Sequence, residues 1–188
     1  MTDELLDVVT DDDRVIAQEM RSVVHNRGLL HRGIHVFLVT ADGHLLVQQR
    51  SKHQETFALA LDCSVSEHVK AGEDYQQAAD RGLSEELGIR GVHTHALVKF
   101  NMAYGLNDFE ICILYEGIVN PALVRFDPSE VEGIAYYHLE ELDKLIQGGE
   151  VVISGWFVQL IQWYLDKPSK MNVLETYPYT SPLRSSGI

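Results

Sequence analysis

Apolar and polar positions alternate with a period of two over much of the chain, which predicts a protein rich in β-strands. The predicted strands are residues 5–10, 14–17, 31–40, 45–49, 96–104, 108–115 and 134–138. The polar run 11–13 predicts a turn between the first two strands. The Asp42-Gly43 pair is a strong hairpin signal and predicts that the next two strands are neighbours.

Helical periodicity appears in three segments. Residues 73–87 carry apolar side chains along one stripe, and Gly88 is suited to end this helix in a left-handed conformation. A second helix is predicted from Leu139 onward, where the sequence reads LEELDKLI. The apolar segment 154–167 predicts a third helix, with Ser154 available as its N-terminal cap.

The order of these elements predicts one domain of the α/β (α+β) class, with helices inserted among the strands of a sheet. The chain has 188 residues, of which 45% are hydrophobic, and this is enough for one sizeable core. We assign residues 1–168 to a single domain, in which about residues 1–20 form an N-terminal hairpin extension. Residues 169–188 are rich in Pro, Ser, Thr and Tyr, and we expect a surface tail that is irregular or partly disordered.

Composition narrows the classes of partner. The formal net charge of −13 argues against attraction to nucleic acid or to an anionic membrane surface. An acidic N-terminal segment and the lack of a long apolar run predict neither export nor a membrane span. Two cysteines without a CxxC spacing suit a reducing, cytoplasmic location. A monomer and a homodimer both remain open.

The segment 67–89, EHVKAGEDYQQAADRGLSEELGI, carries the most specific chemistry in the chain. Carboxylates at one edge of a helix can bind a divalent cation, and Glu85 and Glu86 lie one turn beyond Arg81, which could hold Glu73. An isolated Glu-Glu pair is more typical of a solvated helix face. Here the whole segment resembles the Nudix box, whose spacing is met by Glu73, Arg81, Leu83, Glu85, Glu86, Gly88 and Ile89.

The resemblance implies the Nudix fold, a mixed β-sheet sandwiched between helices, and Mg²⁺-assisted chemistry on a small diphosphate. Two positions depart from the box. Glu67 replaces its first glycine, and Gly82 replaces the glutamate that follows the arginine. A glycine inside a helix costs about 1 kcal/mol relative to alanine, which predicts close packing or space for a ligand at this position.

A second group of possible metal ligands lies outside the box. His25, His31 and His68, together with Asp108 and Glu110, resemble the metal site of the type 1 isopentenyl-diphosphate isomerases, a Nudix branch. Nitrogen and carboxylate ligands of this kind suit Mn²⁺, Zn²⁺ or Mg²⁺. Because imidazoles bind metal only when neutral, we expect the affinity to fall below roughly pH 6.

The isomerase resemblance also implies contacts to substrate. Arg21 and Arg50 match basic contacts to a diphosphate, Glu86 matches a ligand of substrate-bound Mg²⁺, and Trp156 matches an aromatic residue facing an allylic cation. The alternative for the arginines is that they are surface charges, and Trp156 is about as typical of a core residue on an apolar helix as of a ligand contact.

Other positions depart from the isomerase pattern. Ser66 stands in place of the catalytic cysteine, and a hydroxyl is a poor proton donor to an alkene carbon. Gln54 and Gly82 stand where the isomerases have basic residues. Cys63, three positions earlier, is expected on the opposite face of the same strand, where it cannot substitute.

Three functions remain. The first is a Nudix hydrolase of a nucleoside-diphosphate-linked or other organic diphosphate, with Glu85 and Glu86 as metal ligands and Glu110 or Glu67 as the base. The second is an isomerase-like protein, active or decayed, in which Glu110 both binds metal and transfers a proton. The third is a Nudix-fold binding module that has lost turnover.

Overall fold

The computed structural model describes residues 3–54 and 56–185. The strands are β1 (Leu5–Val9), β2 (Val15–Met20), β3 (His31–Val39), β4 (Leu45–Arg50), β5 (Leu61–Asp62), β6 (Val65–His68), β7 (Thr94–Gly105), β8 (Asp108–Ile118), β9 (Val131–Tyr137) and β10 (Asn172–Thr176). The helices are α1 (Arg21–Arg27), α2 (Tyr75–Leu87), α3 (Leu139–Gly148), α4 (Gly155–Tyr164) and α5 (Pro182–Ser185), with a 3-10 turn η1 (Pro121–Leu123).

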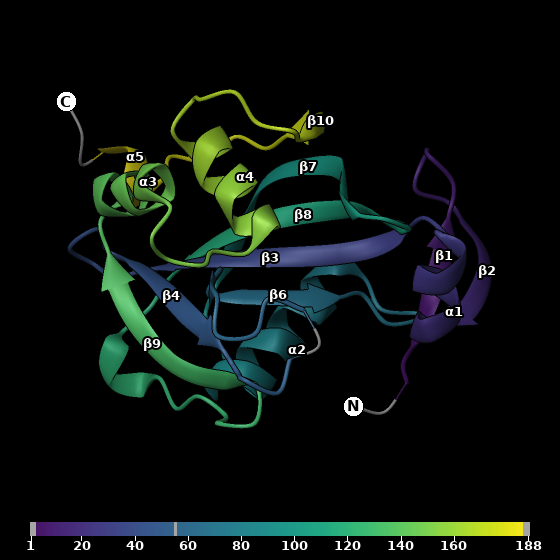
Figure 1. The fold of residues 1–188 in the computed structure, drawn as a ribbon, viewed down its shortest axis with the longest axis horizontal. Coiled ribbons are helices and arrows are strands. Elements are labelled where there is room, and N and C mark those ends of the chain that lie inside the picture. Colours follow the sequence, from purple (N-terminus) through teal and green to yellow (C-terminus); the bar gives the residue numbers. More distant parts are fainter. Residues whose placement is uncertain (1–2, 55, 186–188) are drawn as a thin grey trace.

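The sheet is mixed and centres on β3. This strand pairs in parallel with β8 and antiparallel with β1, β4 and β6. The long path through the sheet runs β10-β7-β8-β3-β1-β2, while β4 branches off to pair with β5 and β9. Helices α3 and α4 lie over one side of the sheet and α2 over the other (Figure 1). The predicted mixed sheet between helices is therefore confirmed.

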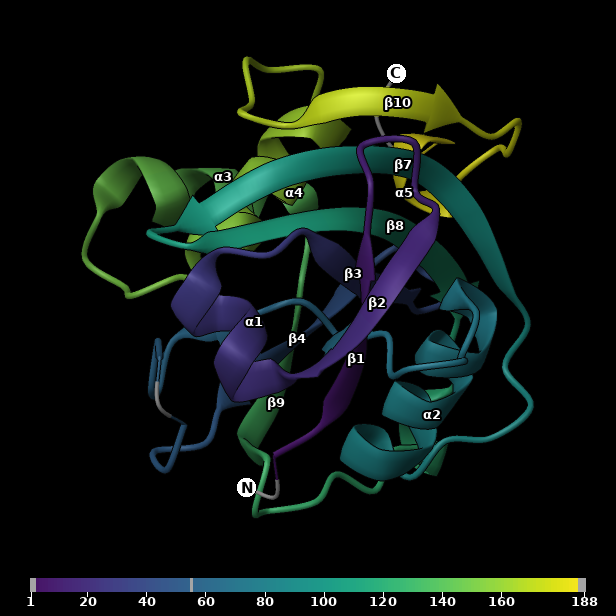
Figure 2. The same ribbon diagram turned by 90° about the vertical axis from the view of Figure 1, so that its right-hand side faces the viewer.

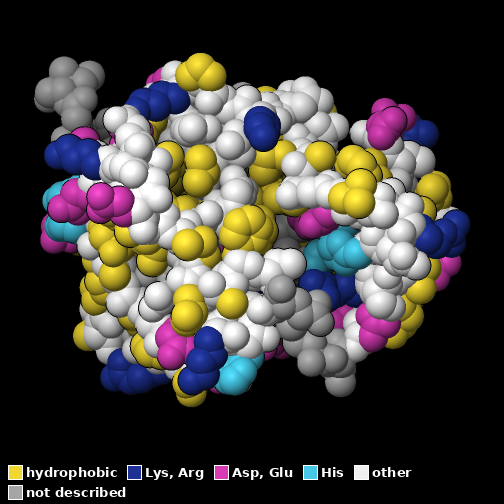
Figure 3. Space-filling view, viewed as in Figure 1, with side chains coloured by type: hydrophobic (Ala, Val, Ile, Leu, Met, Phe, Trp, Pro, Cys, Tyr) yellow, Lys and Arg dark blue, Asp and Glu magenta, His cyan; other side chains and the backbone are white. Residues whose placement is uncertain are grey.

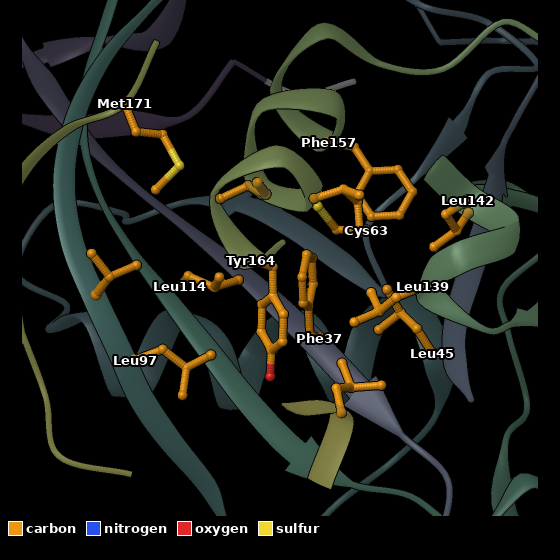
Figure 4. Packing of buried hydrophobic residues seen from close by; sticks show 14 of the residues in the cluster. Phe37, Leu45, Cys63, Leu97, Leu114, Leu139, Leu142, Phe157, Tyr164 and Met171 are labelled. Carbon is orange, nitrogen blue, oxygen red and sulfur yellow. The ribbon is translucent and has the colours of Figure 1, made fainter. Parts of the chain in front are cut away.

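Alternation along β3 supplies both faces of the core. Phe37 and Val39 point to the side of α3 and α4, where Phe37 packs edge-on against Phe157 with ring centroids 5.9 Å apart. Figure 4 shows Phe37 and Tyr164 side by side in this cluster, which also contains the fully buried Leu45. Burying such side chains contributes roughly 1.5–3 kcal/mol each, so this face fixes α4 on the sheet.

The other face of β3 holds α2. Val36 and Leu38 join a second buried cluster with Leu83 on the apolar stripe of that helix. Asp74 caps the start of α2 by accepting a hydrogen bond from a backbone N–H, and Gly88 ends it in the left-handed conformation expected from the sequence. The packing and the two caps therefore fix the position of the carboxylates at the C-terminal end of α2 relative to β6.

The N-terminal extension forms the predicted hairpin of β1 and β2 and continues into α1, which the periodicity did not predict. Figure 2 shows this unit lying across the end of the sheet, with α1 beside it. Helix α1 has only 7 residues, RSVVHNR, too few for a periodic signal. It ends at Gly28 in a left-handed conformation, and the chain then returns into β3.

One local prediction near the C-terminus is wrong. Residues 172–176 form β10, which pairs antiparallel with β7, whereas an irregular tail is expected from the sequence. All five side chains of β10 are exposed, so no apolar alternation marks the strand. Ser154 occupies the predicted N-cap position of α4, but its side chain makes no capping bond, because its hydroxyl donates to Asp62.

No helix in the described part of the chain is both long enough and apolar enough to cross a membrane.

Candidate active site

A cavity of about 490 Å³ opens between α1, β6, the end of α2 and the start of α4. Figure 3 shows histidine, acidic and basic side chains gathered where this face of the molecule is hollowed. The predicted site residues that line the cavity are Arg21, His25, Arg50, Ser66, Glu67, His68, Glu85, Glu86, Asp108, Glu110 and Trp156. Residues from six separate elements, α1, β4, β6, α2, β8 and α4, therefore meet at one place.

The three predicted histidine ligands form a compact cluster. His25 Nε2 lies 3.3 Å from His68 Nε2, and the ring centroids of His25, His31 and His68 lie between 4.9 and 5.2 Å apart. One ligand atom from each ring lies within 4.8 Å of the other two. The cluster depends on α1, which places His25 beside His31 at the start of β3 and His68 at the end of β6.

Carboxylates complete this cluster. Glu110 Oε1 lies 3.5 Å from His31 Nε2 and 3.6 Å from His68 Nε2, and Asp108 Oδ1 lies 3.4 Å from His25 Nδ1. Gly33 on β3 makes room for Glu110, because a Cβ there would stand 2.1 Å from Glu110 Oε2. The alternation predicted for β8 holds, since the Cys112 thiol donates to Glu110 Oε2 at 3.1 Å.

The donor set fits a divalent cation. Nδ1 of His31 hydrogen-bonds to the carbonyl oxygen of Leu29, which turns Nε2 toward the cluster. Buried His31 Nε2 and Asp108 Oδ1 have no hydrogen-bond partner within the described ranges. Polar atoms buried without a partner cost free energy, and a bound cation would satisfy both.

Charge within the cluster favours ionised ligands. Burial raises the pKa of Glu110, but the imidazoles of His31 and His68, which lie 3.5 and 3.6 Å from its Oε1, outweigh this and hold the pKa well below its ordinary value. Burial lowers the pKa of His31, and Glu110 more than offsets this, so the pKa of His31 is raised. Glu110 is therefore an anion at neutral pH.

The box helix is organised by Arg81. Its guanidinium donates to both carboxylate oxygens of Glu73 at 3.0 and 3.2 Å, as the spacing suggested, and to the backbone carbonyl of His68 at 2.8 Å. The same group lies 3.2 Å from Glu67 Oε2 and 3.3 Å from Glu85 Oε2. Arg81 thus connects the loop after β6 to α2. Its single positive charge is shared by the carboxylates of Glu67, Glu73 and Glu85.

Glu86 lies deeper in the cavity than Glu85. Its side chain is buried, Oε2 accepts a hydrogen bond from Gln48 Nε2 at 2.9 Å, and Oε1 is buried with no hydrogen-bond partner in the described part of the chain. Burial raises the pKa of Glu86 well above 4.5, and the charge of Glu67 raises it further. Glu85 is exposed at the rim. The two neighbouring glutamates therefore differ in their environments.

Asp62 orients the two residues assigned to substrate at the α4 side. Its carboxylate accepts hydrogen bonds from Arg50 at 2.9 Å, Trp156 Nε1 at 2.6 Å and Ser154 at 2.8 Å. The Arg50 guanidinium also lies over the Trp156 ring, 5.3 Å from its centroid. The indole N–H of Trp156 is thus fixed by Asp62, while its ring contacts Phe57 and lines the cavity.

Ser66 is part of a buried polar chain. Its hydroxyl lies 3.0 Å from His35 Nδ1, and His35 Nε2 lies 2.9 Å from the hydroxyl of Tyr104. Tyr104 contacts the Cys112 thiol at 3.2 Å. The expectation for Cys63 is wrong: this residue lies in the turn between β5 and β6, and its Sγ is 4.0 Å from His35 Nδ1, on the side of Ser66.

Comparison with known families agrees with this geometry. The NUDIX domain family matches residues 29–154, which is more than half of the chain and includes the box helix and most of the cavity. The chain belongs to the Nudix family. Members generally use divalent cations, and the unpartnered oxygens and nitrogens described above suit one.

The relatives of this Nudix chain include proteins named Nudix hydrolases and proteins named isopentenyl-diphosphate isomerases. An uncharacterised Nudix hydrolase of Nostoc sp. is 36% identical over 121 residues, covering 60% of this chain and 72% of that protein. Human isopentenyl-diphosphate delta-isomerase 2 is 31% identical over 191 residues, covering 87% and 83% respectively. The crystal structure of DR0079 from Deinococcus radiodurans superposes with a TM-score of 0.74 at 26% identity, covering 85% and 98% of the two chains.

The remaining box residues of this Nudix protein shape the helix instead of lining the cavity. Leu83 and Ile89 are buried in the α2 core, Gly88 ends the helix, and Glu73 holds Arg81. Sequence reasoning missed His35, Gln48, Asp62 and Tyr104. A polar residue inside an otherwise apolar strand was an available signal for His35 and Gln48, whereas Asp62 lies in a strand of 2 residues with no readable pattern.

Proposed function

We propose that this Nudix protein hydrolyses a small organic diphosphate, of the kind in which a phosphoanhydride links a nucleoside or another organic group. The observation that carries the proposal is Glu86, which lines a cavity shared with Glu67 and Glu85 and has a buried oxygen that lacks a hydrogen-bond partner within the described residues. A divalent cation bound there supplies polarisation of a phosphoryl oxygen and a lower pKa for water. Mg²⁺ suits these oxygen ligands.

The chain's own residues divide the remaining work. Arg21 and Arg50 line the cavity and bring positive charge to a diphosphate in a protein that is otherwise strongly acidic. Glu110 is held as an anion and is the candidate base that takes a proton from the attacking water, with Glu67 as the alternative. Trp156 presents an aromatic face to the organic group.

A substrate screen tests this function. Purified protein is incubated with nucleotide sugars, nucleoside di- and triphosphates and prenyl diphosphates, with Mg²⁺ and Mn²⁺ compared. A phosphatase converts newly formed monophosphates to inorganic phosphate for detection. We expect metal-dependent release from one nucleotide class, and release from none of the substrates with either metal would contradict the proposal.

A second candidate is an isopentenyl-diphosphate isomerase-like activity, favoured by the cluster of His25, His31, His68 and Glu110. Here Glu110 would transfer a proton as well as bind metal. Ser66 argues against it, because the hydroxyl replaces the thiol of the isomerase pattern. Exchange of solvent hydrogen into isopentenyl diphosphate without phosphate release would support this candidate. Tight binding of a diphosphate with neither reaction would support a binding module.

A further inference from the structure

The missing side chain at Gly82 is explained by the residue that packs over it. A Cβ at Gly82 would lie 2.6 Å from Val65 Cγ1 and 3.0 Å from Glu67 Cγ, so the side chains of β6 already occupy this space. Gly82 lies in the interior of α2, where glycine is unfavourable by about 1 kcal/mol. The Glu67 side chain therefore crosses α2 at the position where the helix itself lacks a carboxylate.

The carboxylate of Glu67 belongs to the cavity. Glu67 lines it together with Glu85 and Glu86, and its Oε2 lies 3.2 Å from Arg81 Nη1. Arg81 is already bound by both oxygens of Glu73. The carboxylate of Glu85 also lies 3.3 Å from Arg81, so one guanidinium is shared by three carboxylates at this end of α2.

Glu86 independently points to a ligand at the same place. It is only 6% exposed, and its buried Oε1 has no hydrogen-bond partner in the part of the chain described by the structure. Positions 82 and 86 are one helical turn apart on the same face of α2. A carboxylate lying over Gly82 is therefore the natural neighbour of Glu86, and Glu67 and Glu86 line the same cavity.

We propose that Glu67, reaching across from β6, supplies the carboxylate that Gly82 lacks, and that Glu67 and Glu86 together bind one divalent cation of the Mg²⁺ type. Two carboxylates that repel each other in a partly dry site gain most from a hard cation between them. The inference rests on the proposed use of a divalent cation at α2. In this proposal a ligand from strand β6 replaces the ligand that the box pattern has on the helix, at the position of Gly82.

Metal binding tests the assignment without any substrate. Mg²⁺ is titrated calorimetrically into metal-free protein, because Mg²⁺ prefers oxygen ligands and reports on α2 more than on the histidine cluster. Glu67→Gln keeps the shape and an oxygen for Arg81, and we expect its Mg²⁺ affinity to fall at least about tenfold. Glu19→Gln is the matched control, because Glu19 lies on β2 and does not line the cavity, and its affinity should not change.

Transfer of the carboxylate back to the helix gives a second test. Glu67→Gly combined with Gly82→Glu restores the box pattern, and Val65→Ala makes room for the new Cβ. We expect this variant to recover most of the affinity that Glu67→Gly with Val65→Ala loses. Circular dichroism checks that each variant folds. If a variant does not fold, its titration is replaced by a measurement on the unmutated protein, in which Mg²⁺ is added and the shift of the Glu67 side-chain carboxyl ¹³C resonance is followed.

Three results would overturn the assignment. They are unchanged Mg²⁺ affinity in Glu67→Gln, a folded swapped variant that recovers nothing, and a Glu67 carboxyl resonance that Mg²⁺ does not move. A different outcome is that Mg²⁺ binding depends on Glu67 but the protein releases phosphate from no substrate. It would contradict the proposed hydrolase while supporting the role of Glu67.

Discussion

The hydroxyl oxygen of Ser66 lies 3.0 Å from Nδ1 of His35, a histidine that is almost completely buried. Burial lowers the pKa of His35, so the ring is neutral at physiological pH and can share a hydrogen bond with the hydroxyl. Ser66 faces the cavity at the position where the isomerase pattern has its catalytic thiol. The neighbouring His35 leaves this position polar and hydrogen-bonded but without an acidic group.

Ser66→Cys should therefore raise the rate of hydrogen exchange into isopentenyl diphosphate above that of the natural protein. A thiol is a far stronger acid than a hydroxyl, and a positioned acid or base typically contributes about 10²-fold or more to a rate. Incubation with isopentenyl diphosphate in D₂O, followed by NMR, measures the exchange. Ser66→Ala is the matched control with no proton to give. Equal exchange in the Cys and Ala variants would contradict the prediction.

Glu86→Gln should abolish most hydrolysis. The substitution keeps the shape of the side chain and a hydrogen-bonding partner for Gln48, but it removes the charge that the proposed cation needs. We expect turnover to fall by about 10²-fold or more, as is usual when one electrostatic stabiliser of a transition state is lost. Rates per folded molecule are compared with those of Glu132→Gln, outside the cavity. Undiminished turnover would place the active site elsewhere.

The elements that carry long periodic patterns were predictable from the sequence, and the site was predictable only in part. The apolar stripe of α2 and the alternation of β3 gave their positions and their buried faces, because packing on both sides of the sheet uses the same periods. The contribution of α1 could not be predicted, since a helix of 7 residues has no stripe to read. Asp62 could not be assigned either, because its role arises from Arg50, Ser154 and Trp156, which meet only in the folded chain.

The buried charge of Glu86 predicts an unusual pH dependence of stability in metal-free protein. Its folded-state pKa is raised well above 4.5, so between about pH 4.5 and that raised value the folded state binds more protons than the unfolded state. The contribution of Glu86 to stability is therefore present at low pH and is lost as pH rises. Thermal unfolding in EDTA should show Glu86→Gln gaining stability over the natural protein from pH 5 to pH 7. Glu85→Gln, at an exposed position, should not gain in this way.

The histidine cluster should lose Mn²⁺ or Zn²⁺ at a higher pH than histidine chemistry alone suggests. Protonated imidazole cannot bind metal, and Glu110 raises the pKa of His31 above 6.5. The decline in affinity should therefore begin above pH 6.5, and not near pH 6 as the sequence suggested. Titration of Mn²⁺ followed by electron paramagnetic resonance measures it from pH 5 to 8. His68→Ala should abolish this binding, whereas His93→Ala, outside the cavity, should leave it intact.

The turn between β1 and β2 is attached to the body of the protein through Asp13. Its backbone has a φ of 59°, and its carboxylate accepts hydrogen bonds from Arg32 and Lys99, each at 2.5 Å, and from Tyr75 at 3.0 Å. These partners lie on β3, β7 and α2. One side chain thus links the extension that carries α1, and with it His25, to three elements of the domain.

Asp13→Asn should destabilise the fold by about 3 kcal/mol, because it leaves two partly buried cations without their carboxylate. Asparagine tolerates a positive φ, so the change removes charge without adding backbone strain. Burial raises the pKa of Asp13, but hydrogen bonds from Lys99 and Arg32 outweigh burial and lower this pKa below 3.8. The stabilisation by Asp13 is therefore present at neutral pH and is lost as pH falls through the lowered pKa. Urea unfolding at pH 7 measures the loss. Asp12→Asn, an exposed position in the same turn, is the control and should unfold like the natural protein, and equal stability of the two variants would show that Asp13 does not anchor the extension.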